Sequence, residues 1–512
     1  MATLKLGRYP LAVLLLIGCM LLASCERGTK EAAPSDAPSY SLPEDEVTLT
    51  FYMLGDKKSA TDKVWAKVSD YVKGKGLNVR FSVKFIPVND FKKEMLVLAA
   101  SGSKWDMNFD ADWQSYREMA ANGAYMSLNE LLPTYAPNLY EKYKALKVLQ
   151  ATEVNGNITA LPWTIQMNQR PYAQWRSDLT KKAGIDPTPD SIRTIEDLDV
   201  FLHVLKKAFP NAKLTRSLPR DVYMLRDEWV DIGFHGMGFY LNDPNVTILP
   251  VEQQPFFLES ARMARKWFAD GILNKDTGID TADGATLWKQ GNMVFTLQSH
   301  EWVSANQGFI DPSFEQESSL LYPDKRYVNR SPVANVVAIN RNSEHPDRVL
   351  RFLDMLETDR VLYDLVQYGI EGETYVLRGD GSVDYPKGMG TPTSNYMEWG
   401  GQWGLWRLQF MRPTPTYGEG FWDREREFAI QSRNVDSPIS GLFISEDNIR
   451  AELLKRDELI NQYGGPLELG TAAGTEQAVE DYVRMQDNDG LKRILAEAQS
   501  QVDAYLEHYR KE

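Results

Sequence analysis

Four stretches of the chain combine large aromatic side chains with planar polar ones. Asp110, Asp112 and Trp113 follow a predicted strand, and Trp163 stands close to Gln166. The other two groups are Gln298, His300, Glu301 and Trp302, and then Tyr396, Glu398, Trp399, Gln402 and Trp403. Aromatic faces stack on apolar surfaces, whereas carboxylates and amides form directional hydrogen bonds. Each group therefore suits a ligand with apolar faces and polar edges.

Several of these residues also have a purely structural interpretation. Asp112 can cap the helix that is predicted to follow it, and Trp113 can pack against that helix. His300 fits a hydrogen-bonded structural histidine. Trp302 and Trp399 are the strongest candidates for ligand contact, because polar residues surround both. By contrast, Trp65 and Trp267 lie on predicted helices at apolar spacing and are predicted to lie in the core.

The first 25 residues have the pattern of an export signal. Lys5 and Arg8 precede an apolar run over 10–22, which is shorter than the roughly 20 residues of a membrane span. The sequence LASC at 22–25 resembles the lipobox of bacterial lipoproteins, whose signal peptidase cuts before a cysteine that carries lipid. An ordinary secretory signal or a short anchor helix is the alternative.

The lipobox resemblance implies removal of residues 1–24 and lipid attachment at Cys25. The mature protein would then lie outside the cytoplasm, held at the cell membrane by the lipid alone. Residues 25–46 are rich in Pro, Ser and Glu, which predicts a flexible tether between the lipid and the folded body.

Composition excludes several classes of site. The chain has only two cysteines, Cys19 and Cys25, so a mature chain starting at Cys25 can form no internal disulfide, zinc cluster or thiol nucleophile. Loss of the two positive charges of the signal takes the formal charge from −14 to −16, which argues against nucleic acid as a partner. The acidic stretches 106–112 and 276–283 lack the spacing of a calcium loop. We expect no metal and no cofactor.

Strands and helices alternate at the start of the folded part. The predicted strands cover 47–54, 78–87 and 104–109, and the predicted helices cover 58–74, 89–101 and 113–122. This alternation indicates a mostly parallel sheet, in which ligands bind at the carboxyl ends of the strands. Further helices are predicted at 194–208, 251–270, 346–358, 447–463 and 475–510, and further strands at 292–298 and 333–340.

The order of motifs resembles that of the extracellular solute-binding proteins (family 1) of ABC importers, in particular sugar-binding lipoproteins related to maltodextrin- and alginate-oligosaccharide-binding proteins. The motifs are ASGSKWDMNFDADW (100–113), GAYMSLNELL (123–132), NGNITALPWTIQMN (155–168) and ATLWKQGNMVFTLQSHEW (285–302). Three later motifs resemble a C-terminal extension found in a subgroup of these lipoproteins: YGIEGETYVL (368–377), GGQWGLWRL (400–408) and NVDSPISGLFIS (434–445).

The resemblance implies an α/β, two-lobed fold of the periplasmic-binding-protein type (type II), with discontinuous lobes. We expect crossings between the lobes near 163–168, 328–333 and 386–394. The first lobe would comprise 47–165 and 332–390, and the second 166–331 and 391–512, including the helical extension.

The resemblance also implies a function. The protein would bind an oligosaccharide between its lobes and deliver it to the permease subunits of an ABC importer, as a monomer and without catalysis. The four aromatic groups would then form the sugar site, with Gln166 at the first crossing. Their acidic residues favour a neutral glycan, although Arg170, Arg176 and Arg407 could offset that charge. A surface glycoside hydrolase and a peptide-binding lipoprotein remain the alternatives.

Overall fold

A computed structural model describes residues 44–164, 171–188, 190–276, 284–298, 311, 313–329, 331–390, 393–418, 420–429 and 434–509. All of them belong to one unit that begins at Glu44. Cys25 and the export signal lie outside the described residues. No helix within the described ranges combines the length and the apolar character that crossing a membrane requires.

A five-stranded sheet organises the first lobe. Its order is β2 (Val79–Ile86), β1 (Val47–Leu54), β3 (Met107–Asp110), β14 (Val336–Ile339) and β6 (Leu161–Pro162). β1 runs parallel to β2 and β3, as predicted, whereas β14 is antiparallel to β3 and β6. The sheet is therefore mixed, because the chain returns to it from the second lobe in the opposite direction.

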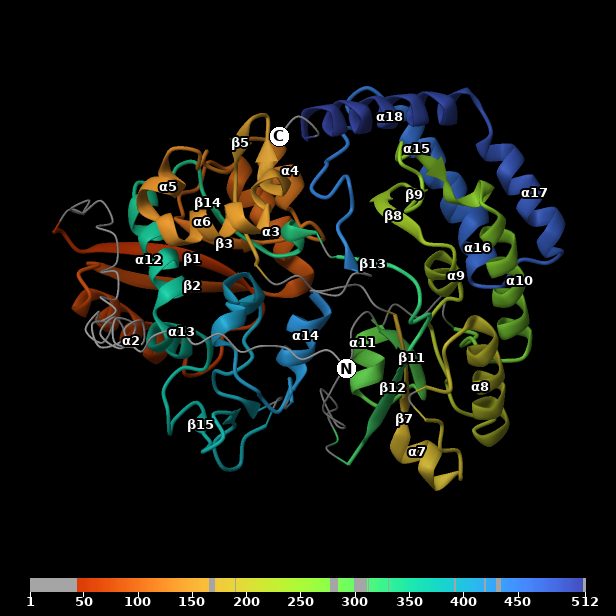
Figure 1. Cartoon of the computed structure of the whole chain (residues 1–512), viewed down its shortest axis with the longest axis horizontal. Helices are drawn as coiled ribbons and strands as arrows, with labels where there is room; N and C mark the ends of the chain where they lie inside the picture. Colours follow the sequence, from red (N-terminus) through yellow and green to blue (C-terminus); the bar gives the residue numbers. More distant parts are fainter. Residues whose placement is uncertain are drawn as a thin grey trace, which may run out of the picture. The chain divides into compact units, whose positions relative to one another are not determined.

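Helices surround this sheet (Figure 1). They are α2 (Thr61–Gly74), α3 (Val88–Ala100), α4 (Tyr116–Ala121), α5 (Leu131–Tyr135), α6 (Pro137–Leu146), α12 (Pro346–Thr358) and α13 (Arg360–Gln367). Trp65 of α2 is buried against Phe51 and Phe81 of the sheet, which confirms its predicted place in the core.

The second lobe contains two small antiparallel sheets. One has the order β11 (Phe295–Gln298), β7 (Tyr172–Arg176) and β12 (Gln316–Leu320). The other has the order β10 (Leu249–Pro250), β9 (Met237–Tyr240) and β8 (Trp229–Phe234). The helices of this part are α7 (Ser177–Lys182), α8 (Ile195–Ala208), α9 (Arg220–Arg226), α10 (Pro255–Ala269) and α11 (Gly284–Lys289).

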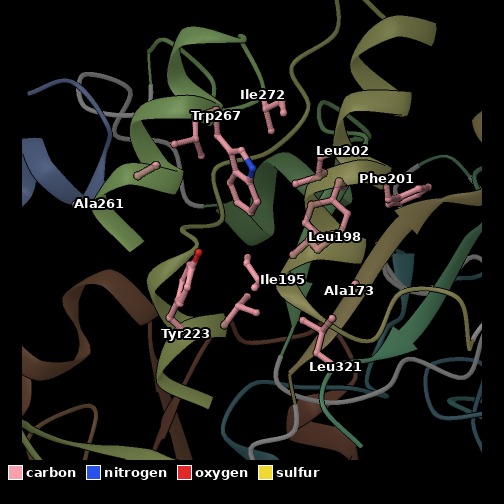
Figure 2. Packing of buried hydrophobic residues seen from close by; sticks show 14 of the residues in the cluster. Ala173, Ile195, Leu198, Phe201, Leu202, Tyr223, Ala261, Trp267, Ile272 and Leu321 are labelled. Carbon is pink, nitrogen blue, oxygen red and sulfur yellow. The ribbon is translucent and has the colours of Figure 1, made fainter. Parts of the chain in front are cut away.

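Helices α8 and α10 supply much of the core of this lobe. Figure 2 shows Trp267 of α10 facing Leu202, Leu198 and Tyr223, and Trp267 is fully buried, as predicted. α8 begins with the predicted capping box, in which the Thr194 hydroxyl accepts from the Asp197 N–H and the Asp197 carboxylate accepts from the Thr194 N–H.

The C-terminal extension forms α15 (Arg450–Leu459), α16 (Gly465–Glu468), α17 (Thr475–Gln486) and α18 (Asp489–Tyr509). The helix predicted over 475–510 is thus two helices. Ile494 and Val502 of α18 share one buried cluster with Phe234 and Met237 of the β8–β9 hairpin. A buried ion pair between Arg456 and Glu252, with Nη1 and Oε1 at 2.8 Å, further joins the extension to the second lobe.

Residues 393–429 lie on the first lobe, which corrects the predicted boundary at 390. Tyr396 and Trp399 pack beside Trp65, and Gly400 lies against Leu54 and Gly55. Figure 1 draws β15 (Val376–Leu377) below α13, and α14 (Phe421–Ala429) on the side of this lobe that faces α11.

The crossing expected near 386–394 instead occurs after α14. There β17 (Asn434–Val435) pairs with β13 (Tyr327–Val328). Trp399 and Trp403, which precede α14, pack on Phe85 and Phe109 of the first sheet, and burial of these apolar rings stabilises the segment there.

Candidate functional site

Several strands of the first sheet end at one edge, which we call the carboxyl edge. β1, β3 and β6 end there at Leu54, Asp110 and Pro162, and the antiparallel β14 begins there at Val336. The N–H groups of Asp112 and Trp163 donate to the carbonyls of Val333 and Asn335, both at 3.0 Å. These bonds fix the two loops that follow β3 and β6 on either side of the start of β14.

The tryptophan-rich segment 399–406 lies directly on this edge. A Cβ atom on Gly400 would stand 2.4 Å from the carbonyl oxygen of Leu54, and one on Gly404 would stand 3.2 Å from that of Val336. Only glycine allows such close approach of two backbones. The two glycines therefore bring the intervening and following tryptophans onto the carboxyl edge.

Trp113 is the most exposed tryptophan of the edge. Its side chain is 47% exposed, yet its indole N–H donates to the carbonyl of Ala334 at 2.9 Å. It lies in a turn before α4 rather than on the predicted helix 113–122. Trp113 and Trp403 flank Phe109, with ring centroids 6.2 and 6.1 Å from it. An exposed ring held in one orientation is suited to stacking on a ligand.

Five aromatic residues form a cluster next to Trp403, which we call the aromatic cluster. Its members are Trp163, Trp406, Tyr417, Phe421 and Trp422. Trp163 and Trp406 stack with centroids 6.1 Å apart, and Trp406 meets Trp422 edge-on at 5.2 Å.

Glu398 lies at the border of the aromatic cluster in a strained conformation, with φ at 60°. Its Oε2 accepts from the Tyr385 hydroxyl, while its buried Oε1 has no hydrogen-bond partner among the described residues. The negative charge of Glu398 also helps burial to raise the pKa of Tyr417. Lys58 donates to the carbonyl of Met397 at 2.8 Å; burial lowers its pKa, against the attraction of Glu398.

Three further buried polar atoms belong to a member of the aromatic cluster or to a residue next to one in the sequence, and have no partner in the described part of the chain. They are the hydroxyls of Thr164 and Thr416 and the indole N–H of Trp422. Buried polar groups are nearly always hydrogen-bonded, so these four groups, Glu398 included, are available to form hydrogen bonds with a ligand.

Residues 56–361 match the family described as bacterial extracellular solute-binding protein. The chain belongs to this family. Residues 438–507 also match a domain of unknown function, DUF3502. That match coincides with the extension packed on the β8–β9 hairpin, so in this solute-binding protein it is part of the second lobe.

One curated relative of this binding protein is a carbohydrate ABC transporter substrate-binding protein from Streptococcus pneumoniae serotype 4. The two are 22% identical over 91% of this chain and 92% of the relative. The family is named for extracellular proteins, which places the folded body outside the cytoplasm.

Two solved structures illustrate the fold. The N-glycan transport solute binding protein NgtS from Streptococcus pneumoniae superposes with a TM-score of 0.75 and 18% identity, over 90% of this chain and 99% of that one. The alginate-binding protein AlgQ2 superposes with a TM-score of 0.62 and 18% identity, over 90% and 99%. The binding protein thus has the two-lobed type II fold expected from the motifs.

Three residues proposed for the site lie in the interior of the binding protein. Tyr396 and Trp399 are both 0% exposed, and both donate to the carbonyl of Val366, at 2.7 and 3.3 Å. Protein atoms cover both rings, so the prediction that they stack on a ligand is corrected to a packing role. Gln402 is also buried, within the short 3-10 helix η5 (Gln402–Leu405).

Asp110 is likewise a structural residue. Its buried carboxylate accepts from the Ala111 N–H at 2.8 Å, from the N–H and hydroxyl of Ser115 at 3.1 Å, and from the Tyr125 hydroxyl. Burial raises the pKa of Asp110 to about 6, against these hydrogen bonds. Asp110 therefore braces the turn that presents Trp113, rather than facing a ligand.

The structure brings Asp112, Trp163, Glu398 and Trp403 to the carboxyl edge or the adjoining aromatic cluster. Gln166 and Trp302 lie outside the described residues, and for Gln298 only the backbone is described, paired with Tyr172 in the second lobe. Sequence reasoning overlooked Trp406, Tyr417 and Trp422. The WGLW and YGEGFW spacings of aromatics around glycines were the available signal.

Proposed function

We propose that this chain is the substrate-binding lipoprotein of an ABC importer and that it binds an oligosaccharide between its two lobes. The observation that carries the proposal is the exposed but anchored ring of Trp113 at the carboxyl edge, which contacts the same Phe109 ring as Trp403. Sugar rings offer apolar C–H faces to such platforms and hydroxyls to polar side chains nearby. The curated relative is named for carbohydrate, and NgtS was crystallised with Man1GlcNAc and with Man5GlcNAc.

In this proposal the first lobe supplies Asp112, Trp113, Trp163, Glu398 and Trp403. The second lobe supplies Gln298, Trp302 and the crossing residue Gln166. A ligand that contacts both lobes binds the closed form more tightly than the open form and therefore stabilises the closed form. The closed form then docks on the permease subunits. The protein acts as a monomer and leaves the sugar chemically unchanged.

Calorimetric titration of the purified mature protein with an oligosaccharide panel tests the proposal, with chromatography of the same mixtures after overnight incubation. We expect saturable binding to at least one glycan and intact ligand at the end. Steady release of shorter sugars would favour the hydrolase alternative. Binding of peptides without binding of any glycan would favour the peptide-binding alternative.

The lipid anchor and the importer need separate tests. Replacing Cys25 with serine should abolish incorporation of labelled palmitate and release the protein from membranes, whereas Cys19→Ser should leave both unchanged. Deleting the chromosomal permease subunits should stop uptake of the glycan that the protein binds. Continued uptake would contradict the role in import.

A further inference from the structure

We infer that the site accepts neutral, hydroxyl-bearing sugar units and rejects uronic acids. This inference rests on the proposed function and specifies its ligand class. The group that carries it is Glu398, whose Oε1 is buried at the border of the aromatic cluster without a partner among the described residues.

A carboxylate oxygen can only accept hydrogen bonds. The ligand atom that reaches Glu398 must therefore donate, as a hydroxyl or an acetamido N–H does. The carboxylate of a uronic acid would bring a second acceptor and a second negative charge to the same place. Like charges in a desolvated site repel strongly, so the uronate pays a penalty that a neutral sugar avoids.

The other three unpaired atoms require a ligand that can also accept hydrogen bonds. The indole N–H of Trp422 is a donor only, whereas the hydroxyls of Thr164 and Thr416 can donate or accept. Taken with Glu398, the set calls for groups that both donate and accept. Sugar hydroxyls have this property, and an ionised carboxylate lacks it.

Three cations of the described residues that could attract a uronate already have partners. Arg407 pairs with Glu357, with Nε and Oε2 at 2.7 Å, and Arg176 pairs with Asp178, with Nε and Oδ1 at 2.7 Å. Both arginines are buried in these pairs. Lys58 faces Glu398 itself and donates to the carbonyl of Met397. A uronate would have to break an existing buried pair, which costs several kcal/mol of pairing and desolvation in typical proteins.

Unpaired indole N–H groups also occur elsewhere, as at Trp65 and Trp175. Those two lie in the separate interiors of the first and second lobes. In the aromatic cluster, by contrast, the unpaired atoms come from three separate segments of the chain: Thr164 next to Trp163, Glu398 near Tyr417, and the segment that holds Thr416 and Trp422. This concentration distinguishes a ligand site from isolated core tryptophans.

Calorimetry with two ligand sets of equal length tests the inference. The neutral set contains mannotetraose, cellotetraose and tetra-N-acetylchitotetraose, and the acidic set contains tetramers of mannuronate and galacturonate. We expect binding within the neutral set and affinity at least about 100-fold weaker for every uronate, as found when a site leaves polar groups unpaired. Uronate binding as tight as, or tighter than, neutral binding overturns the inference and leaves the proposed function standing. No binding by either set, nor by a wider glycan panel, refutes the proposed function itself.

Two variants locate the discrimination. Glu398→Gln keeps the shape and removes the charge, so we expect about tenfold weaker binding of the neutral ligand and a smaller gap to the uronates. Glu371 is an exposed glutamate on the same lobe, so Glu371→Gln is the matched control. It should change neither the affinity for the neutral ligand nor the gap to the uronates. Trp422→Phe removes the N–H but keeps an aromatic ring, and provides a second test if Glu398→Gln unfolds. Wild-type affinity for both ligand sets in a folded Glu398→Gln protein would overturn the assignment.

Discussion

Replacing Gly400 with alanine tests whether the tryptophan-rich segment must lie directly on the carboxyl edge. The new Cβ would stand 2.4 Å from the Leu54 carbonyl oxygen and 2.8 Å from the Gly55 Cα. Both atoms belong to the backbone, so no side chain can rotate away. Gly400 itself lies outside the left-handed region, which means that alanine suffers no conformational strain of its own there. The whole effect must come from the overlap.

The overlap forces residues 399–406 away from β1. Overpacking of this kind costs about 1–3 kcal/mol of stability. Trp403 follows three residues later and contacts Phe109, so a shift of the segment also moves this ring relative to Trp113. Loss of one aromatic contact is worth about 0.5–1.5 kcal/mol, which corresponds to roughly a 2- to 12-fold loss of affinity for the sugar.

Thermal unfolding and calorimetric titration of the Gly400→Ala protein measure the two effects. Gly379→Ala is the matched control, because a Cβ there meets nothing within 4 Å and the backbone is not left-handed. We expect a lower Tm and weaker sugar binding for Gly400→Ala only. If the two variants behave alike, the close approach of the segment to β1 is not what positions the site.

Three further predictions follow from single contacts. Trp113→Ala should weaken sugar binding about tenfold or less, whereas Phe443→Ala, a similarly exposed aromatic elsewhere, should bind as wild type in the same titration. The folded pKa of Asp110 (about 6) exceeds its ordinary value of 3.8, so its contribution to stability is full below about pH 4 and is lost as the pH rises through about 6. Between about pH 4 and 6, the free energy of unfolding of Asp110→Asn should change by about 3 kcal/mol less than that of the wild-type protein. An equal change in the two proteins would contradict the burial argument. Arg456→Met should destabilise the second lobe by about 3–5 kcal/mol because it leaves the buried Glu252 carboxylate unpaired, and adding Glu252→Leu should restore much of the loss in the same unfolding assay.

Local patterns in the sequence predicted the elements that depend on local chemistry. The Thr194–Asp197 capping box starts α8 as expected, since both partners lie within one turn of the helix. The alternation of strands and helices after Val47 likewise predicted the parallel β1–β2 and β1–β3 pairs. Trp65 and Trp267 could be assigned to the core because their helical spacing already aligns them with other apolar residues.

The site was harder to predict because burial of an irregular segment depends on tertiary contact. Trp399 and Trp403 have similar neighbours in the sequence, yet Trp399 is fully buried beside Trp65 while Trp403 is partly exposed beside Phe109. Trp399 is held inward by contacts with residues far away in the sequence, namely the rings of Trp65 and Phe85 and the carbonyl of Val366. Asp110 was misassigned for a related reason. Its place at a strand end suggested a ligand, but Ser115 and Tyr125 already occupy its oxygens.

The boundary of the first lobe depends on the same contacts. The region 393–429 has no regular periodicity that would assign it to either lobe. Its tryptophans and tyrosines bury themselves on the first sheet, and the crossing is delayed until β17 pairs with β13.

A crystal structure of the mature protein with a bound neutral oligosaccharide tests the account most directly. We expect a sugar ring within about 4 Å of the faces of Trp113 and Trp403, the distance of apolar contact, and a ligand hydroxyl donating to Glu398. A glycan bound elsewhere, with Trp113 still open to solvent and Glu398 Oε1 still unpaired, would contradict it.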